Sequence, residues 1–513
     1  MNSVPGCEES IYQGYAASRT GGTVPLFRGG KPANSLYNPE KEAEKAAARF
    51  PAGTFAVFGG LADGRRIEYF LQQDRENTCI VIEKNHASLV SLSAFPSVKR
   101  ICSCARVTVL SLDTTGNGGL TGCITAGYLP ALFRNFSLDI LQSWRNACPE
   151  AARQIEEETR RALDVISGDF STQAAFGRIW LANALQNICL FRNAENRFPF
   201  PDRKKTAVIT AAGPSLDKES AALRENRESL VVFAADTSLP VLVQAGVYPD
   251  FVVSIDPQPV SARHLSVAGK NICGTRKPPV FLADICASPF AVRTASAFGW
   301  PVILTGGGHP LAAYLQRFAR LPPLETAAGT VTASAADAAR RMGFSAVRFA
   351  GADFACTGGK PYCRGTYLDV QFGSGSIRTR TAETRFNELM FRTKTKKIPE
   401  AGNRFTYRTE LLDSYRDAVA RLTESSGPTG LWTGEDFRPF PCESFLQEFR
   451  CSLLKMQKNA ADIFRAEDPY AAAALLPAAA FFRRKNPQET RENILKKTIQ
   501  LALHLIDRYT SFI

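Results

Sequence analysis

The sequence predicts an α/β protein built around a parallel sheet, and the strongest evidence lies in residues 204–259. Three short runs there are apolar and rich in β-branched or aromatic residues, as buried strands are; they are residues 207–210, 230–234 and 251–255. Helical patterns separate consecutive runs. Strands that alternate with helices form a parallel sheet covered on both faces, so we expect this architecture for the centre of the chain.

Turn-forming and polar residues follow each of these three predicted strands. After the first strand, Gly213 and Pro214 form a sharp turn and Ser215 is a favoured helix N-cap, which predicts a backbone that binds anions. Acidic or hydroxyl side chains follow the second and third strands, namely Asp236, Thr237, Ser238 and Asp256. Open α/β sheets bind ligands at the carboxyl ends of their strands, so we predict a nucleotide site here. The alternative is a tight turn with aspartates that only cap helices.

A second glycine and hydroxyl turn precedes a helix later in the chain. Further strands are predicted at residues 280–283, 302–304 and 346–350. Gly329 and Thr330 open a strong helical pattern, which predicts a second anion-binding helix start. His309 and Asp353 each follow a predicted strand. Because histidine titrates near neutral pH, His309 is a candidate for the catalytic base. Asp250, Asp256 and Asp353 compete with it, and the alternative for each aspartate is a helix cap or an ion pair.

The sequence of the first part of the chain predicts one half of a Rossmann-like domain. Its expected elements are strands at residues 54–58 and 78–82 and a helix at residues 64–71. The first strand ends in Gly59 and Gly60 without a complete Gly-x-Gly-x-x-Gly pattern, and the second ends in Glu83. An acidic residue in this place can hold a ribose hydroxyl, but the incomplete glycine pattern favours a scaffold.

The chain divides into four predicted parts. They are a Rossmann-like domain (1–126), a helical connector (127–203), the central α/β domain (204–377) and a helical C-terminal region (378–513). In the connector, helices are expected at residues 139–144, 151–166 and 175–191. Residues 378–397 are basic, which is typical of a solvated face or of a loop that docks an anionic substrate or acceptor. The C-terminal helices are expected to serve homo-oligomerisation or to hold a protein acceptor.

Composition and charge narrow the function classes. The 513 residues are 45% hydrophobic and 22% charged, as in a globular protein with a large core. The net charge of +13 favours acidic ligands such as nucleotide-sugars, but no basic block with interleaved aromatic residues predicts nucleic-acid binding. No apolar run has membrane-spanning length, and the start does not resemble a secretion signal. The thirteen scattered cysteines predict reduced thiols in a cytoplasmic protein.

Several stretches resemble the bacterial motility-associated factor (Maf) proteins, a family of flagellin glycosyltransferases. The most specific is the run AGVYPDFVVSID at residues 245–256. The others are the Gly-Pro-Ser-Leu-Asp turn at residues 213–217, Asp-Thr-Ser at 236–238, the helix start at 329–332, Asp353, Gly-Gly-Lys at 358–360 and the helix opening near Pro39. Thr330 departs from the Ser or Asn that is usual in the family but keeps a hydroxyl. The resemblance covers about residues 35–90 and 204–370.

This resemblance implies a sialyltransferase-like central domain that transfers a nonulosonic (sialic-acid-like) sugar from a CMP-activated donor to Ser or Thr of flagellin. Flagellar assembly and motility would depend on that transfer. The residues expected to line the nucleotide are Gly213, Pro214, Ser215, Asp236, Thr237, Ser238, Gly329 and Thr330. The catalytic candidates are Asp256, His309 and Asp353. No Asp-x-Asp motif is present, so we expect a reaction without a metal or other cofactor.

Two other functions fit the sequence. The central domain also resembles archaeal pterin pyrophosphokinases, in which its aspartates would hold magnesium for pyrophosphoryl transfer from ATP. The length of the chain, its N-terminal domain and its helical tail favour a protein acceptor instead. The third hypothesis is a non-enzymatic flagellin-binding accessory protein. The incomplete Gly59-Gly60 loop suggests it, whereas the intact turn at Gly213 and the presence of Asp236 argue against it.

Overall fold

The structure is a computed structural model, and it divides into two compact units. It describes residues 9–116, 118–191, 200–272, 277–400, 404–424, 430–433, 441–458 and 467–510. The first unit comprises Met1–Arg178, Asn459–Asp462 and Leu476–Gln500, and the second comprises Ile179–Lys458, Ile463–Leu475 and Leu501–Ile513. These are packing units, so the predicted functional boundaries at residues 126, 203 and 377 stay predictions. Part of the predicted connector, residues 192–199, lies outside the described residues.

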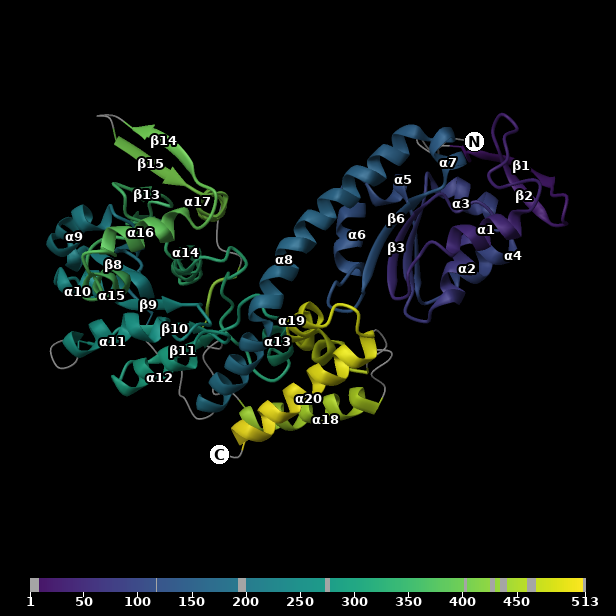
Figure 1. The fold of residues 1–513 in the computed structure, drawn as a ribbon. Coiled ribbons are helices and arrows are strands. Elements are labelled where there is room, and N and C mark those ends of the chain that lie inside the picture. The colour runs from purple at the N-terminus through teal and green to yellow at the C-terminus, as the bar shows by residue number, and fades with distance from the viewer. Residues whose placement is uncertain are drawn as a thin grey trace. The chain divides into compact units, whose positions relative to one another are not determined.

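The first unit contains a four-stranded parallel sheet with the strand order β5-β4-β3-β6. Two of its strands, β3 and β6, are labelled in Figure 1. Its strands are β3 (Thr54–Gly59), β4 (Thr78–Glu83), β5 (Val107–Ser111) and β6 (Asn135–Ile140). An antiparallel hairpin precedes them, formed by β1 (Tyr12–Ala17) and β2 (Thr23–Phe27). The helices of this part are α1 (Pro39–Ala47), α2 (Arg65–Gln73), α3 (His86–Leu92), α4 (Pro96–Cys102), α5 (Leu112–Thr115), α6 (Gly119–Gly127) and α7 (Gln142–Ala147). The predicted Rossmann-like arrangement is therefore present.

Strand β6 corrects the helix predicted at residues 139–144. Apolar and polar residues alternate along it, which is the period of a strand, and it pairs in parallel with β3. Helix α7 begins only at Gln142. The two helices predicted at residues 151–166 and 175–191 form one helix, α8 (Pro149–Leu190), because the polar residues between them include no proline. The division into units falls within α8, after Arg178.

The second unit contains the predicted central parallel sheet, with six strands in the order β11-β10-β9-β8-β7-β12. They are β7 (Thr206–Thr210), β8 (Leu230–Ala235), β9 (Phe251–Ser254), β10 (Val280–Asp284), β11 (Val302–Thr305) and β12 (Val347–Ala350). Its helices are α9 (Leu216–Glu225), η1 (Arg227–Ser229), η2 (Asp236–Ser238), α10 (Leu239–Gln244), α11 (Ser261–Ile272), α12 (Pro289–Ala297), α13 (Pro310–Leu315) and α14 (Val331–Arg341). The α/β fold class is confirmed.

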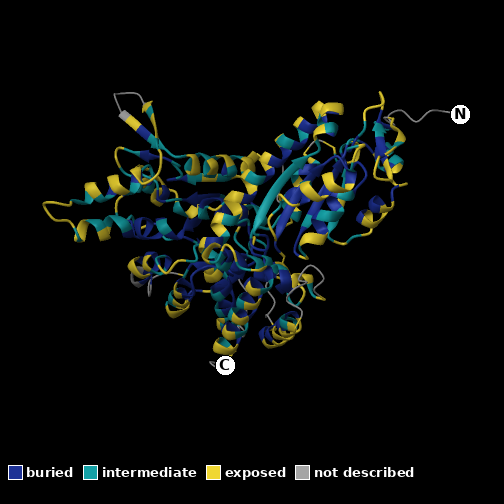
Figure 2. Cartoon of the chain, turned by 45° about the vertical axis from the view of Figure 1, so that its right-hand side comes forward, coloured by how far each residue is buried: buried dark blue, intermediate teal, exposed yellow. Residues whose placement is uncertain are grey.

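The core of the second unit lies between this sheet and α14. Phe233, Val253 and Leu282 on the strands are buried in one cluster with a row of small side chains from the helix. The helix residues are Ala335, Ala336, Ala338 and Ala339, and their small size lets α14 lie close to the strands. Buried residues line the strands, whereas exposed residues lie mainly on helices and loops (Figure 2). The sheet is therefore a rigid support for the loops at its ends.

The C-terminal part is mainly helical, as predicted. Its helices are α16 (Ala382–Phe391), α17 (Glu410–Glu424), α18 (Cys442–Lys458), α19 (Pro469–Lys485) and α20 (Arg491–Thr510), and α15 (Tyr367–Ser374) precedes them at the end of the predicted central domain. The basic segment does not form one solvated loop, because it contains α16 and enters a hairpin of β14 (Lys396–Glu400) and β15 (Arg404–Arg408) (Figure 1). Strand β13 (Cys356–Thr357) joins this hairpin as a third strand. Among the described residues, no helix combines the length and apolarity needed to cross a membrane.

Candidate functional site

The six parallel strands of the second unit end along one edge, where side chains with ligand-binding chemistry gather. Strands β7 to β11 follow one another to one side, and β12 lies beside β7 on the other. The strand order therefore reverses at β7, and a crevice at such a point is where α/β sheets bind ligands. We call the residues at these strand ends the strand-end row; from β11 to β12 they are His309, Asp284, Asp256, Asp236, Gly213 and Asp353.

The strand order separates the three residues predicted as catalytic. Asp256 follows β9, two strands from His309 and three strands from Asp353. Because neighbouring strands lie about 4.8 Å apart, these steps correspond to roughly 10 Å and 14 Å. Reacting groups must come within about 3.5 Å of each other. The three residues therefore belong to different parts of the row, and Asp256 lies in the middle beside Asp236.

Asp236 and Asp256 form a pair of carboxyl groups on adjacent strand ends. Asp236 is buried, and its Oδ2 accepts the Ser254 hydroxyl at 2.6 Å. Burial raises the pKa of Asp236 to about 7, and the charge of Asp256 adds to that rise. Asp256 is half-buried and accepts the Gln258 N–H at 2.9 Å, and burial raises its pKa as well. Asp236 therefore gains or loses its proton near neutral pH, which suits acid–base chemistry.

Tyr362 lies close to this pair. Burial raises the pKa of the Tyr362 hydroxyl; the nearby charge of Arg392 lowers it, and that of Asp236 raises it further. The next residue, Cys363, donates its N–H to the Ala212 carbonyl at 2.9 Å, so this segment crosses the end of β7. Arg392 lies in the predicted basic segment, which thus supplies a positive charge near Tyr362.

The turn at Gly213 is occupied by a carboxylate of the protein itself. The Ser215 N–H donates to Asp353 Oδ2 at 3.0 Å, and the Ser215 hydroxyl makes no capping bond to α9. A Cβ on Gly213 would collide with Asp353 Oδ2 and would lie 2.5 Å from the Gly351 carbonyl oxygen. Phe354, next to Asp353, has a left-handed φ of 46°, which is rare for a bulky residue. The structure thus brings Gly213, Ser215 and Asp353 together, and Asp353 holds the position predicted for an anionic ligand.

Gly213→Ala is expected to lower the free energy of unfolding of the second unit by about 3 kcal/mol, the upper range for an overpacked site. The Gly351 carbonyl belongs to the backbone and cannot move aside as a flexible side chain can. Gly373→Ala is the matched control, because a Cβ there meets nothing within 4 Å and the site is helical. Chemical denaturation followed by circular dichroism measures both variants. Equal midpoints for the two would contradict the proposed crowding.

The other residues predicted to line the nucleotide divide into two groups. Ser238 is buried, and its hydroxyl lies 2.9 Å from that of Thr210 and donates to backbone carbonyls, so it joins β7 to η2. Thr237 lies beside it in η2, and Pro214 stays within the turn before α9.

The second group lies at the other predicted helix start. Gly329 and Thr330 precede α14, with Gly329 at a φ of 69°. A Cβ on Gly329 would lie 3.4 Å from the ring of Tyr415, whose charge acts on Tyr362. The start of α14 therefore lies beside Tyr415.

His309 is a buried side chain with one ring nitrogen already hydrogen-bonded. Its Nδ1 accepts the Leu311 N–H at 3.1 Å, so the proton of the neutral ring lies on Nε2. Burial lowers the pKa of His309 to about 4, which keeps the ring neutral at pH 7. The edge of the ring faces Trp180, with the ring centroids 6.1 Å apart. His309 can therefore donate a hydrogen bond from Nε2, and its catalytic role stays a prediction.

Asp284 is the member of the row that the sequence analysis did not identify. It is the last residue of β10, and its Oδ1 accepts the Cys286 N–H at 2.8 Å. Burial raises its pKa to about 6. The nearby Gly307 N–H favours the ionised form without reaching hydrogen-bond geometry, so Oδ2 has no partner among the described residues. The sequence contained a signal for Asp284, because an acidic residue directly follows the strand predicted at residues 280–283.

The corresponding crevice of the first unit is filled by side chains. Glu83, at the end of β4, accepts hydrogen bonds from the Trp144 indole at 2.5 Å, the Tyr12 hydroxyl at 3.1 Å and the Leu61 N–H at 3.0 Å. A Cβ on Gly60 would lie 2.6 Å from the Trp144 ring. The glutamate that could have held a ribose therefore binds the protein itself. This geometry agrees with a scaffold role for the Rossmann-like domain rather than with a ribose-binding site.

Trp144→Ala is expected to destabilise the first unit locally by about 3–5 kcal/mol, because the side chain is fully buried and its loss leaves a cavity. It also leaves Glu83 without one donor. Trp144→Phe, which keeps a ring and removes only the N–H, should cost less. Hydrogen exchange of the β3 and β4 amides measures the local effect. Unchanged protection in Trp144→Ala would contradict a packing role for this residue.

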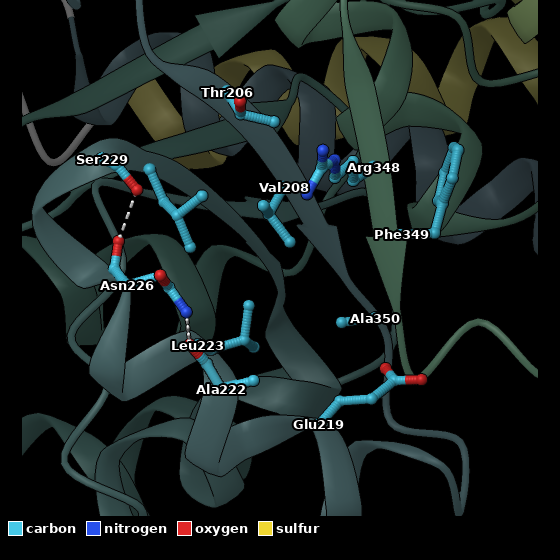
Figure 3. Close-up of a pocket in the computed structure, with 11 residues that line it drawn as sticks. Thr206, Val208, Glu219, Ala222, Leu223, Asn226, Ser229, Arg348, Phe349 and Ala350 are labelled. Atoms are coloured by element: carbon cyan, nitrogen blue, oxygen red, sulfur yellow. Dashed lines mark hydrogen bonds between the residues drawn. The ribbon is translucent and has the colours of Figure 1, made fainter.

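A cavity of about 300 Å³ lies away from the strand-end row. Figure 3 shows residues of α9, among them Glu219 and Leu223, facing residues of β7 and β12, among them Thr206 and Arg348. Glu219 accepts the Gly351 N–H at 2.8 Å, so its carboxylate is already engaged. None of the paired carboxyl groups lines this cavity. The carboxyl groups suited to acid–base chemistry therefore lie in the strand-end row, and the row is the candidate functional site.

Among the described residues, no three His, Cys, Asp or Glu side chains are grouped closely enough to hold a metal ion. Mg²⁺ in nucleotide enzymes needs only one or two carboxylates, because the substrate phosphates supply further ligands. Asp236 and Asp256 fit that smaller requirement. A nucleotide that carries magnesium is thus compatible with the pair.

Two kinds of sequence comparison place the chain among known proteins. Residues 180–359 match a family described as "6-hydroxymethylpterin diphosphokinase MptE-like". This region includes β7 to β12 and every member of the strand-end row. An uncharacterized protein of Treponema pallidum (strain Nichols) is 36% identical over 250 residues, which are 49% of this chain and 83% of that protein. The chain belongs to the same protein family as this treponemal protein. A second uncharacterized T. pallidum protein is 37% identical over 145 residues, 28% of this chain and 69% of its own length.

A structural comparison extends the likeness to the whole chain. The structure of a Maf glycosyltransferase from Magnetospirillum magneticum AMB-1 aligns with 98% of this chain and 87% of its own, with a TM-score of 0.54. The sequence identity is 13%, so the shared property is the fold. The predicted resemblance to the Maf fold is therefore confirmed.

Proposed function

We propose that the chain is a cytoplasmic glycosyltransferase that attaches a nonulosonic, sialic-acid-like sugar from a CMP-activated donor to Ser or Thr of flagellin and thereby supports flagellar assembly and motility. The observation that carries this proposal is the Asp236–Asp256 carboxyl pair at the middle of the strand-end row, in a chain with a Maf-like fold. The donor and the acceptor hydroxyl would meet at this pair. No cofactor takes part in the proposed reaction.

In the proposed reaction, Asp256 acts as the base. The acceptor oxygen forms a bond to the anomeric carbon of the sugar while the bond from that carbon to the CMP phosphate oxygen breaks, and its electron pair leaves with CMP. The hydroxyl proton passes to the Asp256 carboxylate. Burial raises the pKa of Asp256, which makes it a stronger base than an exposed aspartate. The carboxyl group of Asp236 lies on the adjacent strand end, beside Asp256.

The departing CMP phosphate needs positive charge and N–H donors. The N–H groups that begin α14, after Gly329 and Thr330, together with Arg392, are proposed to supply them. Gly213, Pro214 and Ser215 remain part of the proposed nucleotide site. Binding of a phosphate there requires Asp353 to release the Ser215 N–H, because both are anions at one helix start. The net charge of +13 favours the anionic donor over neutral sugars.

A magnesium-dependent pyrophosphokinase is the second candidate function. The match of residues 180–359 to the MptE-like diphosphokinase family supports it. In that reaction Asp236 and Asp256 would hold magnesium bound to the ATP phosphates, and the metal would supply charge stabilisation. The carboxyl pair therefore acts as a base in one hypothesis and as a pair of ligands in the other. A flagellin-binding accessory protein would need neither a base nor metal ligands at this pair.

The transfer reaction can be tested with the purified full-length chain, CMP-activated nonulosonic acid and flagellin. We expect release of CMP and a matching mass increase of flagellin on Ser or Thr, both unaffected by a metal chelator. A parallel reaction contains ATP, magnesium and a hydroxymethylpterin, with AMP as the product. AMP formation without sugar transfer would favour the pyrophosphokinase. No product in either reaction, with flagellin still bound, would favour the accessory protein.

A further inference from the structure

Four buried polar atoms at the β10–β11 end of the strand-end row have no hydrogen-bond partner among the described residues. They are Asn187 Oδ1, Asp284 Oδ2, Ser288 Oγ and His309 Nε2. Their residues are 0%, 4%, 0% and 9% exposed, respectively. Buried polar atoms in proteins nearly always have partners, so several orphaned atoms in one region indicate a place that accepts a ligand.

The contacts of these residues bring them into one region. Asn187 donates from Nδ2 to the carbonyls of Ile285 and Ala287, both at 2.9 Å, which fixes the end of α8 on the loop between Asp284 and Ser288. A Cβ on Gly307 would collide with Asp284 Oδ2. The loop that carries His309 therefore lies directly against Asp284.

This region adjoins the proposed base. The Ser288 N–H donates to the Asp256 carbonyl at 2.9 Å. Asn183, one turn before Asn187 in α8, donates from Nδ2 to the Pro257 carbonyl at 2.9 Å and to the Cys286 carbonyl at 3.1 Å. The loops after β9 and β10 are therefore held together by α8. A ligand that binds at Asp256 can extend from there over the end of β10.

The orphaned atoms define the chemistry of their ligand. Asp284 Oδ2 and Asn187 Oδ1 accept hydrogen bonds. His309 Nε2 carries the ring proton and donates, because Nδ1 already accepts the Leu311 N–H. The Ser288 hydroxyl can do both. A set with two acceptors, one donor and one hydroxyl is complementary to neighbouring hydroxyl groups, each of which donates one bond and accepts others.

We propose that Asn187, Asp284, Ser288 and His309 form a polyol subsite that binds hydroxyl groups of the sugar portion of the substrate. This inference rests on the proposed function, in which that sugar is the group transferred at Asp256. The subsite would set specificity for a sugar with a hydroxylated side chain. It would leave the nucleotide to the part of the row nearer β7 and α14.

Asp284→Asn separates a binding role from a structural one. Asparagine keeps an oxygen for the Cys286 N–H and removes a buried charge whose Oδ2 has no hydrogen-bond partner among the described residues, so the melting temperature should rise. Calorimetry with the full-length chain should show about tenfold weaker binding of CMP-sialic acid and unchanged binding of CMP. Ser288→Ala removes a hydroxyl that makes no hydrogen bond within the described parts of the chain, so we expect weaker sugar binding at unchanged stability. Asp417→Asn, which neutralises an exposed carboxylate of α17, is the matched control.

A second measurement uses free N-acetylneuraminic acid and saturation-transfer NMR without nucleotide. If free sugar binds in an Asp284-dependent way but no CMP compound binds, the subsite stands and the proposed donor is wrong. If CMP-sialic acid binds equally to the wild type and to Asp284→Asn, the subsite is overturned while the proposed function survives. If neither form of the sugar binds to the wild type, the subsite is overturned as well.

Discussion

Asp256→Asn is expected to slow sugar transfer by about 100- to 10,000-fold, the contribution that a positioned general base makes. The amide of asparagine cannot take the proton of the acceptor hydroxyl. Its oxygen can still accept the Gln258 N–H, so the loop after β9 should keep its conformation. The effect should fall on kcat rather than on KM, because binding of the donor does not require the base. The initial rate of CMP release at saturating flagellin measures it.

The pH dependence of the wild type gives an independent check of the base. The reaction needs the deprotonated carboxylate, and burial raises its pKa. Activity should therefore fall as the pH decreases, with a midpoint above the value of about 3.9 for an unperturbed aspartate. Asp417→Asn should keep both the rate and this profile. Full activity in Asp256→Asn would exclude Asp256 as the base.

Asp236→Asn is expected to stabilise the second unit above pH 7 by about 4 kcal/mol, the equivalent of three pKa units. In the folded chain, burial raises the pKa of Asp236 to about 7, whereas in the unfolded chain it is ordinary. Between about pH 4 and pH 7 the folded state thus holds a proton that the unfolded state lacks. The stability of the wild type therefore decreases as the pH rises through this window. Asparagine has no charge to bury, so the variant should not show that decrease.

Thermal denaturation at pH 5 and pH 8 tests this prediction. The melting temperature of the wild type should fall between the two values more than that of Asp236→Asn. Ser254→Ala removes the hydroxyl that hydrogen-bonds the ionised carboxyl, so it should enlarge the fall. Parallel profiles for the wild type and Asp236→Asn would show that Asp236 is not buried with a raised pKa. A gain in stability with a loss of activity is typical of a functional residue.

The fold could be predicted where the pattern of the sequence is local. The apolar runs at β7, β8 and β9 are short and continuous, and the structure confirms the parallel sheet that they form. Strand β6 was missed because its polar residues made the alternating pattern look like one face of a helix. Asp284 was missed because the predicted strand stopped at Ala283, one residue too early.

The partners of Ser215 and Glu83 could not be predicted, because each partner is far away in the sequence. Asp353 reaches the Ser215 N–H across 138 positions, and Trp144 reaches Glu83 across 61. Local sequence identifies a turn that can bind an anion, but it does not show which anion fills that turn. The ring of His309 is different, since the Leu311 N–H that fixes its proton is only two residues away.

The measurement that tests the account most directly is thermal stabilisation of the full-length chain by CMP and by ATP, each with and without magnesium. A ligand that binds only the folded state adds about 2.7 kcal/mol at a hundredfold excess over Kd. We predict stabilisation by CMP without magnesium, and its loss in Ser215→Arg, where the long side chain would fill the turn beside Asp353. Stabilisation by ATP that requires magnesium, with none by CMP, would contradict the sugar-transfer account and favour pyrophosphoryl transfer at the same carboxyl pair.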